Sequence, residues 1–336
     1  MDRNEFAKRL QSLLIAEGTT AEEIKKKVLP ISEALVSLMP NSLFRYRTCN
    51  KLQIDAFEND KIYAVTADLF NDPFDTLVKF DINQIKNAAK TILSSESISQ
   101  LKQYLELGND FPESIMQVLP NGSAEYYKEK VLTADFKALE PSIEEYRNRI
   151  LTLIDLYFPM LAKFSKRYVT IACFCETVRS ITMWSHYANN HQGFALEYNM
   201  RPSLFSKPTN WGLYPVIYDE ERYDASSYMG WSFLKMIGIN SKNPDMFSHA
   251  KCAIHKAPLW EYEKEWRLVD YSPRDCCKEN YTEILYKPTA IYYGVHMSED
   301  NKNQLHRIAS KKGIAEYDMY IDNASPKYEM LYKLLT

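Results

Sequence analysis

Glycine is scarce in this chain, and its scarcity excludes two common ways of binding a phosphate. The 336 residues include nine glycines, and no two of them are spaced as in the P-loop or in the glycine-rich fingerprint of dinucleotide-binding folds. A nucleotide, if one is bound, must therefore be held by side chains or by a different backbone arrangement.

Cysteines at the spacing of a disulfide framework are also lacking. The six cysteines, at positions 49, 173, 175, 252, 276 and 277, follow no such pattern, and no secretory apolar segment follows Met1. No apolar run approaches the length that crosses a bilayer. We therefore expect a cytoplasmic protein without a membrane partner.

A strong charge of either sign is missing as well. The formal net charge is −3, which gives no overall basic field for gripping nucleic acid, although a local basic patch remains possible. The hydrophobic content of 46% is sufficient for a large core. The sequence thus indicates a globular fold and leaves nucleic acid open as a partner.

Hydrophobic spacing divides the chain into three kinds of segment. Apolar positions recur at helical spacing between residues 4 and 38, and Thr20 followed by Glu23 forms a capping-box pattern for a helix over residues 21–29. Residues 82–165 carry helix signals without a strand pattern. We predict a helical N-terminal extension (1–40) and a single α+β domain (41–336) that contains a helical insertion (82–165).

Clusters of β-branched and aromatic residues predict the sheet. The expected strands cover residues 42–47, 61–66, 169–174, 193–198, 213–218, 265–269, 290–295 and 315–320. Because no regular helix alternates with these strands, a doubly wound parallel sheet is disfavoured. The predicted fold class is α+β with a mixed or antiparallel sheet.

The segment 260–267 alternates acids with aromatics. In an extended strand, Glu261, Glu263 and Glu265 would share one face as a carboxylate row. Clustered carboxylates repel each other, and a site that tolerates them usually expects a cation, a positively charged intermediate or a shared proton. The alternative is a solvated face on which Arg267 pairs with Glu265.

The segment 183–194 collects protonable and aromatic side chains at a helix-to-strand transition. They are Trp184, Ser185, His186, Tyr187 and His191. Histidine can serve there as an acid or a base at neutral pH. The alternative is that Trp184 and Tyr187 belong to the core and that His186 caps backbone groups.

The first predicted strand carries two arginines, and the second is followed by a polar loop. The residues are Arg45, Tyr46 and Arg47 in the strand and Asn71, Asp72, Pro73, Phe74 and Asp75 in the loop. A guanidinium can fork onto a phosphate or carboxylate, and a neighbouring aromatic ring can stack on a flat ligand. The alternative is an internal ion pair between one of the arginines and Asp72 or Asp75.

These blocks together resemble a prokaryotic family, the domain-of-unknown-function family 2971. The blocks are Phe-Arg-Tyr-Arg at 44–47, Phe-Asn-Asp-Pro-Phe-Asp at 70–75, Met-Trp-Ser-His-Tyr-Ala at 183–188 with His-x-Gly-Phe at 191–194, and Tyr-Glu-x-Glu-Trp-Arg at 262–267. The resemblance spans about residues 42–296 and leaves the helical extension outside.

The order of the elements is also similar to the ADP-ribosyltransferase superfamily, with the DNA-targeting toxins as the nearest comparison. This resemblance implies an ADP-ribosyltransferase-like sheet in which Arg45 engages NAD, Tyr187 or Ser185 packs at nicotinamide, and Glu265 holds a ribose hydroxyl. Two features depart from that pattern. The middle block is Ser-His-Tyr at the end of a predicted helix rather than Ser-Thr-Ser on a strand, and Glu263 competes with Glu265 for the third role.

The implied reaction is cleavage of NAD with transfer of ADP-ribose to a protein, a nucleic acid or water. Bond breaking develops positive charge on the sugar, which a fixed carboxylate stabilises. We predict Glu265 for that task, Glu263 as general base, Arg45 for the pyrophosphate, and His186 or His191 to orient the acceptor or the ribose. The other residues predicted at the NAD site are Tyr46, Arg47, Asn71, Asp72, Phe74, Trp184 and Ser185. By analogy with ADP-ribosylating toxins, a toxin or phage-defence role is expected.

Two other classes of function remain open. A metal-dependent hydrolase would use Cys173, Cys175, His186 and His191, since thiolates and imidazoles suit zinc. A non-catalytic interaction or sensor module would use the tryptophan, tyrosine and arginine clusters as a binding surface.

Overall fold

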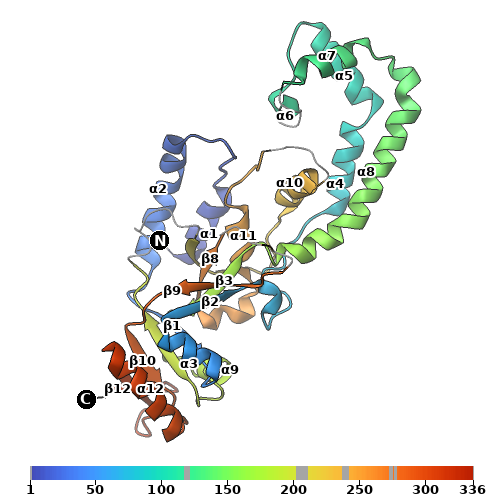
Figure 1. Cartoon of the computed structure of the whole chain (residues 1–336). Helices are drawn as coiled ribbons and strands as arrows, with labels where there is room; N and C mark the ends of the chain where they lie inside the picture. The colour runs from blue at the N-terminus through green and yellow to red at the C-terminus, as the bar shows by residue number, and fades with distance from the viewer. Residues whose placement is uncertain are drawn as a thin grey trace.

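A mixed β-sheet forms the centre of the protein, and helices surround it (Figure 1). The structure is a computed structural model that describes residues 2–116, 122–201, 211–236, 242–271, 275 and 278–335. The strands of the sheet are β1 (Leu43–Arg47), β2 (Lys61–Val65), β3 (Thr170–Cys175), β4 (Phe194–Tyr198), β5 (Trp211–Pro215), β8 (Glu265–Asp270), β9 (Tyr281–Leu285), β10 (Ala290–Tyr293), β11 (Ala315–Tyr320) and β12 (Leu331–Leu334). A separate short pair consists of β6 (Ile217–Tyr218) and β7 (His255–Lys256).

The pairing pattern confirms the prediction of a mixed sheet. The strands β12, β11, β10, β4 and β1 follow one another, and in this series only β10 and β11 are parallel. The parallel pair is joined by the helix α12 (Glu299–Lys312), as a parallel connection requires. The expected strands are present with shifted ends, whereas β9 and β12 were not foreseen. The strand expected over 213–218 is divided between β5 and β6.

β3 is the branching point of the sheet. β8 pairs with it along its whole length, from Thr170 opposite Asp270 to Cys175 opposite Glu265. β1 and β2 therefore share the other edge of β3, and each touches it at a single register position. β1 pairs at Cys175 and β2 pairs at Ile171, so the two strands diverge over the middle of β3. This divergence leaves the space in which the candidate site lies.

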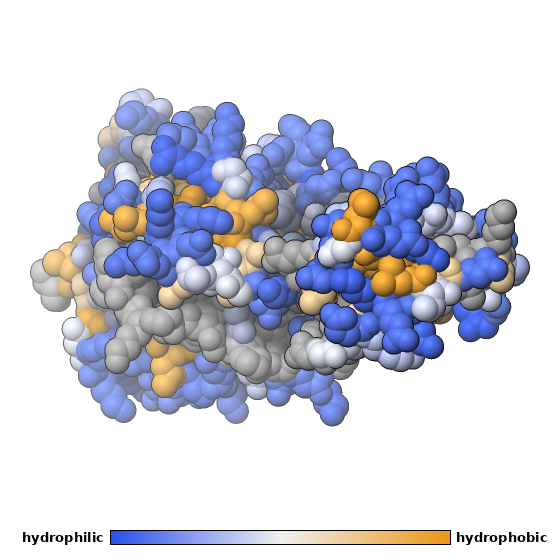
Figure 2. All heavy atoms as spheres, turned by 90° about the horizontal axis from the view of Figure 1, so that it is seen from above, coloured by the Kyte–Doolittle hydropathy of each residue, from blue (hydrophilic) through white to orange (hydrophobic). Residues whose placement is uncertain are grey.

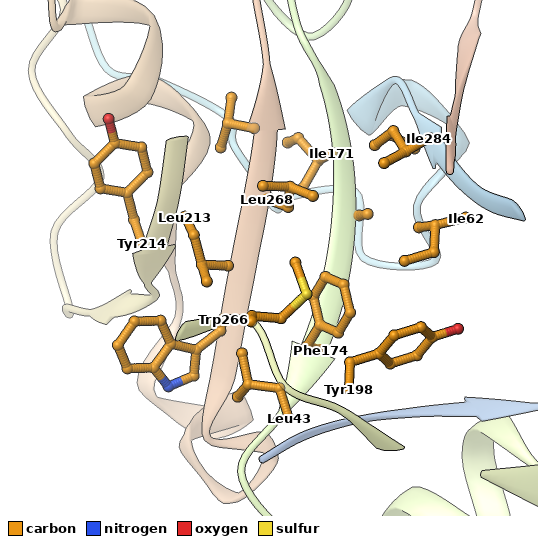
Figure 3. Close-up of a cluster of buried hydrophobic side chains, with 14 of the residues drawn as sticks. Leu43, Ile62, Ile171, Phe174, Tyr198, Leu213, Tyr214, Trp266, Leu268 and Ile284 are labelled. Carbon is orange, nitrogen blue, oxygen red and sulfur yellow. The ribbon is translucent and has the colours of Figure 1, made fainter. Parts of the chain in front are cut away.

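The main hydrophobic core covers β3 and its neighbours. Figure 3 shows Ile171 and Phe174 of β3 beside Trp266 and Leu268 of β8, with Ile62 of β2 further along. These side chains are buried because alternate positions of central strands face the packed layers. Apolar packing thus stabilises the sheet around its branching point.

The first helices contribute to the same core. They are α1 (Arg3–Ser12) and α2 (Ala21–Leu38). Phe6 and Leu10 of α1 are fully buried in the main cluster, and Arg3 donates hydrogen bonds to the carbonyls of Val216 and Glu265. The predicted capping box of Thr20 and Glu23 is present, and the helix it starts continues past residue 29 to Leu38. α1 therefore packs on the sheet that carries the candidate site.

A helical arm projects from the sheet (Figure 1). It comprises α4 (Ile82–Ile92), α5 (Ser95–Glu106), α6 (Glu113–Met116), α7 (Ala124–Thr133) and α8 (Phe136–Ser165). α8 and α4 run side by side, and α5 to α7 lie at the far end. At the base of the arm, Phe158 of α8 packs against Phe233 of α10 (Ser226–Met236).

The surface seen from above is mostly hydrophilic, with apolar residues in separate patches (Figure 2). Within the described ranges, every helix falls short of the length and hydropathy that a membrane span needs. The remaining helical elements are α3 (Lys51–Glu58), α9 (Ile181–Tyr187), α11 (Ser248–Ala253), and the 3-10 helices η1 (Ala67–Leu69) and η3 (Pro258–Glu263).

Candidate functional site

A cavity of about 560 Å³ lies where β1 and β2 diverge over β3. Its size falls in the range of roughly 300–1,000 Å³ that is typical of small-molecule sites. The lining residues come from β1, α3, β2, β3, α9 and β4, together with the loop after β2 and the segment from Lys256 to Glu265. Segments that are far apart in the sequence therefore meet at one hollow.

One wall of the cavity carries the two arginines of β1. Arg45 is only 7% exposed, donates to the Tyr63 carbonyl at 3.2 Å, and lies 5.2 Å from the centre of the Phe174 ring. Its Nε atom has no hydrogen-bond partner among the described residues. Burial, and then the neighbouring Arg47, lower the pKa of Arg45 from 12.5 to about 9. Burial likewise lowers the pKa of Arg47, which also lines the cavity.

Another part of the lining belongs to a buried acidic cluster centred on Lys256 of β7. The ammonium lies 2.5 Å from Glu263, 3.1 Å from Glu265 and 3.6 Å from Asp75. It also lies 4.8 Å from the centre of the Trp260 ring. Burial would lower the pKa of Lys256, but the surrounding carboxylates, Glu265 first, raise it above its ordinary value. The lysine therefore remains charged.

Arg267 completes the cluster from β8. Its Nε donates to Glu265 at 2.9 Å, and one terminal nitrogen donates to Glu265 at 3.1 Å and to Asp75 at 2.7 Å. The other terminal nitrogen donates to the Ala253 carbonyl at 2.7 Å. All five charged side chains of the cluster are buried. Three carboxylates face two cations, so the formal charge is −1 when all are ionised.

The pKa values of the two glutamates of the cluster are shifted in opposite directions. Burial alone would raise the pKa of Glu265, but Arg267 and Lys256 outweigh burial and lower it to about 2. The pKa of Glu263 is instead raised, first by burial and also by the charge of Glu265, although Lys256 and the hydroxyl of Tyr187 oppose this change. Of the two, Glu263 is therefore the carboxylate that takes up a proton more readily.

α9 is tied to η3 by two hydrogen bonds. The Tyr187 hydroxyl donates to Glu263 at 2.7 Å, and the Tyr262 hydroxyl lies 3.2 Å from Nδ1 of His186. Ser180 is the N-cap residue of α9, and its side chain accepts a hydrogen bond from the backbone amide of Met183. One turn later, His186 and Tyr187 reach the cavity. The helix thereby places a phenol and an imidazole next to the acidic cluster.

The expected row of three carboxylates on one strand face is wrong. Residues 258–263 form the 3-10 helix η3, which begins with Pro258, and Lys264 adopts a left-handed backbone conformation before β8 starts at Glu265. Glu261 consequently points to solvent. Glu263 and Glu265 still meet, because both bind Lys256.

Part of the predicted site is brought together and part is not. The predicted residues that line the cavity are Arg45, Tyr46, Arg47, Asn71, His186, Tyr187, Glu263 and Glu265. Those that do not line it are Asp72, Phe74, Trp184, Ser185 and His191.

The residues outside the cavity have local structural roles. Asp72 accepts from the Phe74 amide at 2.8 Å within its turn, and the Phe74 side chain is 63% exposed. Trp184 is fully buried and donates to a backbone carbonyl. Ser185 lies 3.1 Å from Nε2 of His191, whose ring stacks on Trp184. The core interpretation of Trp184 is therefore confirmed.

The alternative interpretation of the β1 arginines, an internal ion pair with Asp72 or Asp75, is wrong. Asp75 pairs instead with Arg267 and Lys256. Neither β1 arginine forms an ion pair with another described residue. The alternative to the carboxylate row was a solvated face on which Arg267 pairs with Glu265. The pair is present, but both side chains are buried, so the face is not solvated.

Lys256 is the main functional residue that sequence reasoning missed. It lies in a two-residue strand, which is too short to show a periodic pattern. One signal for it is present in the sequence, because Lys256 lies between the apolar residues Ile254 and Ala257. A lysine is rarely buried unless it is paired with an acid, so a lysine in an apolar segment indicates a buried ion pair. The sequence suggested Asp75 as a partner of the β1 arginines and Cys173 as a zinc ligand, and both residues line the cavity.

A metal centre finds no support in the geometry. In the part of the chain that the structure describes, no group of three or more His, Cys, Asp and Glu side chains is arranged to hold a metal ion. Cys173 and Cys175 lie on β3, whereas His191 is stacked on Trp184 outside the cavity.

Comparison with known families agrees with one of the two resemblances. Residues 183–268 match the model of a family described as "Protein of unknown function (DUF2971)". This segment contains most of α9, all of η3, Lys256 and both glutamates of the cluster, whereas the blocks at 44–47 and 70–75 lie outside it. No curated protein and no solved structure matches the chain. The comparisons therefore support the family of unknown function over this segment and give no support to a relation with ADP-ribosyltransferases.

Proposed function

We propose that the protein binds NAD in the cavity and cleaves the bond between nicotinamide and ribose, passing ADP-ribose to a macromolecule or to water. The observation that carries the proposal is that one cavity is lined by both basic and acidic side chains. Arg45 and Arg47 come from β1, which pairs with β3 on one side, and the cluster includes Glu265 of β8, which pairs with β3 on the other; its formal charge is −1 when all its carboxylates are ionised. NAD has the complementary order, with an anionic pyrophosphate and a cationic nicotinamide ring.

The arginine wall favours a phosphate ligand. Arg45 is buried without a carboxylate partner, and a buried charge without a partner is costly. A phosphate oxygen would supply the acceptor that its Nε lacks, and it would restore the ordinary preference of the guanidinium for its charged form. Such a contact would bind the phosphate, as a glycine-rich loop does in other nucleotide-binding proteins.

The rest of the lining suits a ligand with flat rings. Aromatic side chains from several elements contribute to it: Phe44, Phe57, Tyr63, Phe70, Phe174, Tyr187 and Tyr198. Aromatic rings stack favourably on planar ligand groups. The cavity thus offers stacking surfaces between its basic and acidic walls.

The acidic wall suits the chemistry of glycosidic cleavage. When the bond from the ribose carbon to the nicotinamide nitrogen breaks, its electron pair leaves with nicotinamide, and the sugar becomes cationic. The negatively charged cluster that includes Glu265 stabilises this cation. A hydroxyl, amine or water then bonds to the ribose carbon and gives its proton to the carboxylate of Glu263.

The test is release of nicotinamide from NAD, measured by chromatography, together with transfer of label from NAD to protein, DNA or RNA. We expect the Glu263→Gln variant to lose turnover while its circular dichroism spectrum remains that of the folded protein. Glu261→Gln is the matched control, because Glu261 lies in the same 3-10 helix but is exposed. A pure protein that neither consumes NAD nor binds it would contradict the proposal.

A binding module without turnover is the second candidate. It is favoured by the complete pairing of Glu265, whose two oxygens are occupied by Arg267 and Lys256. A sensor of this kind would bind NAD or another nucleotide without releasing nicotinamide. It would also keep its biological activity after Glu263→Gln, whereas the enzyme would not.

A further inference from the structure

The ammonium of Lys256 gathers carboxylates from three separate segments. Asp75 comes from the loop after β2, Glu263 from the end of η3 and Glu265 from the start of β8. The lysine is buried and belongs to β7. A single cation therefore fixes the distance between the two glutamates and the loop that carries Asp75.

The second partners of the two glutamates are different. Glu265 also binds the guanidinium of Arg267 through both of its oxygens. Glu263 uses its remaining oxygen to accept from the phenol of Tyr187, which lines the cavity. Glu265 is thus enclosed by permanent cations, whereas Glu263 is linked to the cavity by a neutral group.

We infer that Lys256 is a positioning residue that gives the two glutamates unlike roles. Together with Arg267 it keeps Glu265 ionised, and it holds Glu263 against Tyr187 as the carboxylate that exchanges a proton with the substrate. This inference rests on the proposed function. In the transfer step the proton passes from the incoming hydroxyl, amine or water to Glu263, and Lys256 keeps its charge throughout.

The surroundings of Glu263 determine how its titration responds to substitution. The titratable groups that face it are Lys256 of β7, Glu265 of β8, Tyr187 of α9, Cys175 of β3 and Tyr262 of η3. The charge of Lys256 lowers the pKa of Glu263, and the charge of Glu265 raises it. Removing the charge of Lys256 should therefore raise the pKa of Glu263, and removing the charge of Glu265 should lower it.

The experiment is a carboxyl titration by NMR on protein with selectively 13C-labelled glutamate side chains, with the Glu263 signal assigned from the Glu263→Gln variant. We expect Glu265→Gln to move the Glu263 midpoint to lower pH and Lys256→Met to move it to higher pH. Lys256→Arg retains the cation and should stay near the wild-type midpoint. Glu261→Gln, which removes an exposed charge from the same segment, should leave it unchanged.

A second variant keeps the test usable if Lys256→Met fails to fold. Lys256→Met leaves three buried carboxylates with one cation, so the double variant Lys256→Met, Asp75→Asn removes one charge of each sign. It should still move the midpoint to higher pH. Midpoints that fail to move in folded Glu265→Gln protein and in the folded double variant would overturn the inference.

The pH profile of nicotinamide release separates this inference from the proposed function. If the proposed function and this inference both hold, the pH range over which nicotinamide release increases should shift with the Glu263 midpoint in each variant. A merely structural role of Lys256 would reduce turnover without shifting this pH range, and this result would overturn the inference. The titrations need no NAD, so wild-type protein that shows the expected midpoints but releases no nicotinamide would defeat the proposed function alone.

Discussion

Replacing Arg45 with methionine should stabilise the ligand-free protein. Methionine retains an unbranched stem of similar length but removes a buried cation that has no carboxylate partner in the described structure. A pKa lowered from 12.5 to about 9 corresponds to about 5 kcal/mol of penalty on the charged form, at about 1.4 kcal/mol per pH unit.

Two contacts of the guanidinium reduce this gain. The hydrogen bond to the Tyr63 carbonyl contributes about 1 kcal/mol, and the contact with the Phe174 ring contributes about 1 kcal/mol more. The expected increase in the free energy of unfolding is therefore at most about 3 kcal/mol. Because Arg45 is charged in both the folded and the unfolded state below pH 9, the full difference should be present at neutral pH. It should narrow above pH 9, as the folded protein releases the proton of Arg45.

The assay is urea unfolding of the wild type and the variant at pH 7 and above pH 9, with and without ADP-ribose. ADP-ribose should stabilise the wild type, since it supplies the missing anion, and it should have little effect on Arg45→Met. Arg149→Met is the control. The Arg149 side chain is 73% exposed, so its loss should change stability by less than about 0.5 kcal/mol. Clear destabilisation by Arg45→Met, or equal stabilisation of both proteins by ADP-ribose, would refute the reasoning.

Three other substitutions test the construction of the site. Glu265→Gln should lower the free energy of unfolding in urea by about 3 kcal/mol above pH 4.5, because a pKa of about 2 makes the ionised carboxylate a stabilising group. The difference in stability between the wild type and this variant should vanish as the pH falls from 4.5 toward 2. Gly193→Ala should prevent stable folding, as judged by thermal melting, because the added Cβ would lie 2.1 Å from the Arg47 carbonyl oxygen, whereas Gly230→Ala has free space and should be tolerated. Tyr187→Phe should cost only about 1 kcal/mol in urea unfolding but should raise the pKa of Glu263 in a carboxyl titration, since the phenol hydrogen bond favours the ionised form. Three results would contradict the described contacts. The first is equal acid sensitivity of the wild type and Glu265→Gln, and the second is a stable Gly193→Ala protein. The third is an unchanged Glu263 midpoint in Tyr187→Phe.

The central strands could be predicted because their burial follows from local composition. The run over β3 is rich in apolar and aromatic residues, and every residue of β8 is buried. β9 was missed for the opposite reason. It is an edge strand in which Ile284 is the one buried residue, so polar and exposed side chains hide its pairing with β2. Edge strands of this kind are specified by their neighbour rather than by their own sequence.

The candidate site was predictable where residue chemistry alone is informative. Arg45, Tyr187 and Glu263 were proposed from the unusual concentration of charged and aromatic groups, and the structure places them around one cavity. The ion-pair partners could not be foreseen. The contact between Arg267 and Asp75 joins residues 192 positions apart, and no local pattern reports such a distance.

The conformation of residues 258–264 shows a second limit. Alternating acids and aromatics fit an extended strand, yet this segment forms η3. Pro258 is favourable in the first turn of a helix, and it favours helical over extended backbone at the start of this segment. Glu263 and Glu265 nevertheless lie close together, because the carboxylates of both residues form ion pairs with Lys256.

The most direct test of the central claim is a crystal structure of the protein with a non-cleavable NAD analogue. The account predicts that the pyrophosphate lies within hydrogen-bond distance of the Arg45 guanidinium and that the nicotinamide riboside lies beside Glu263 and Tyr187. An analogue bound at saturation anywhere other than this cavity, or in the cavity with its phosphates away from Arg45, would contradict it.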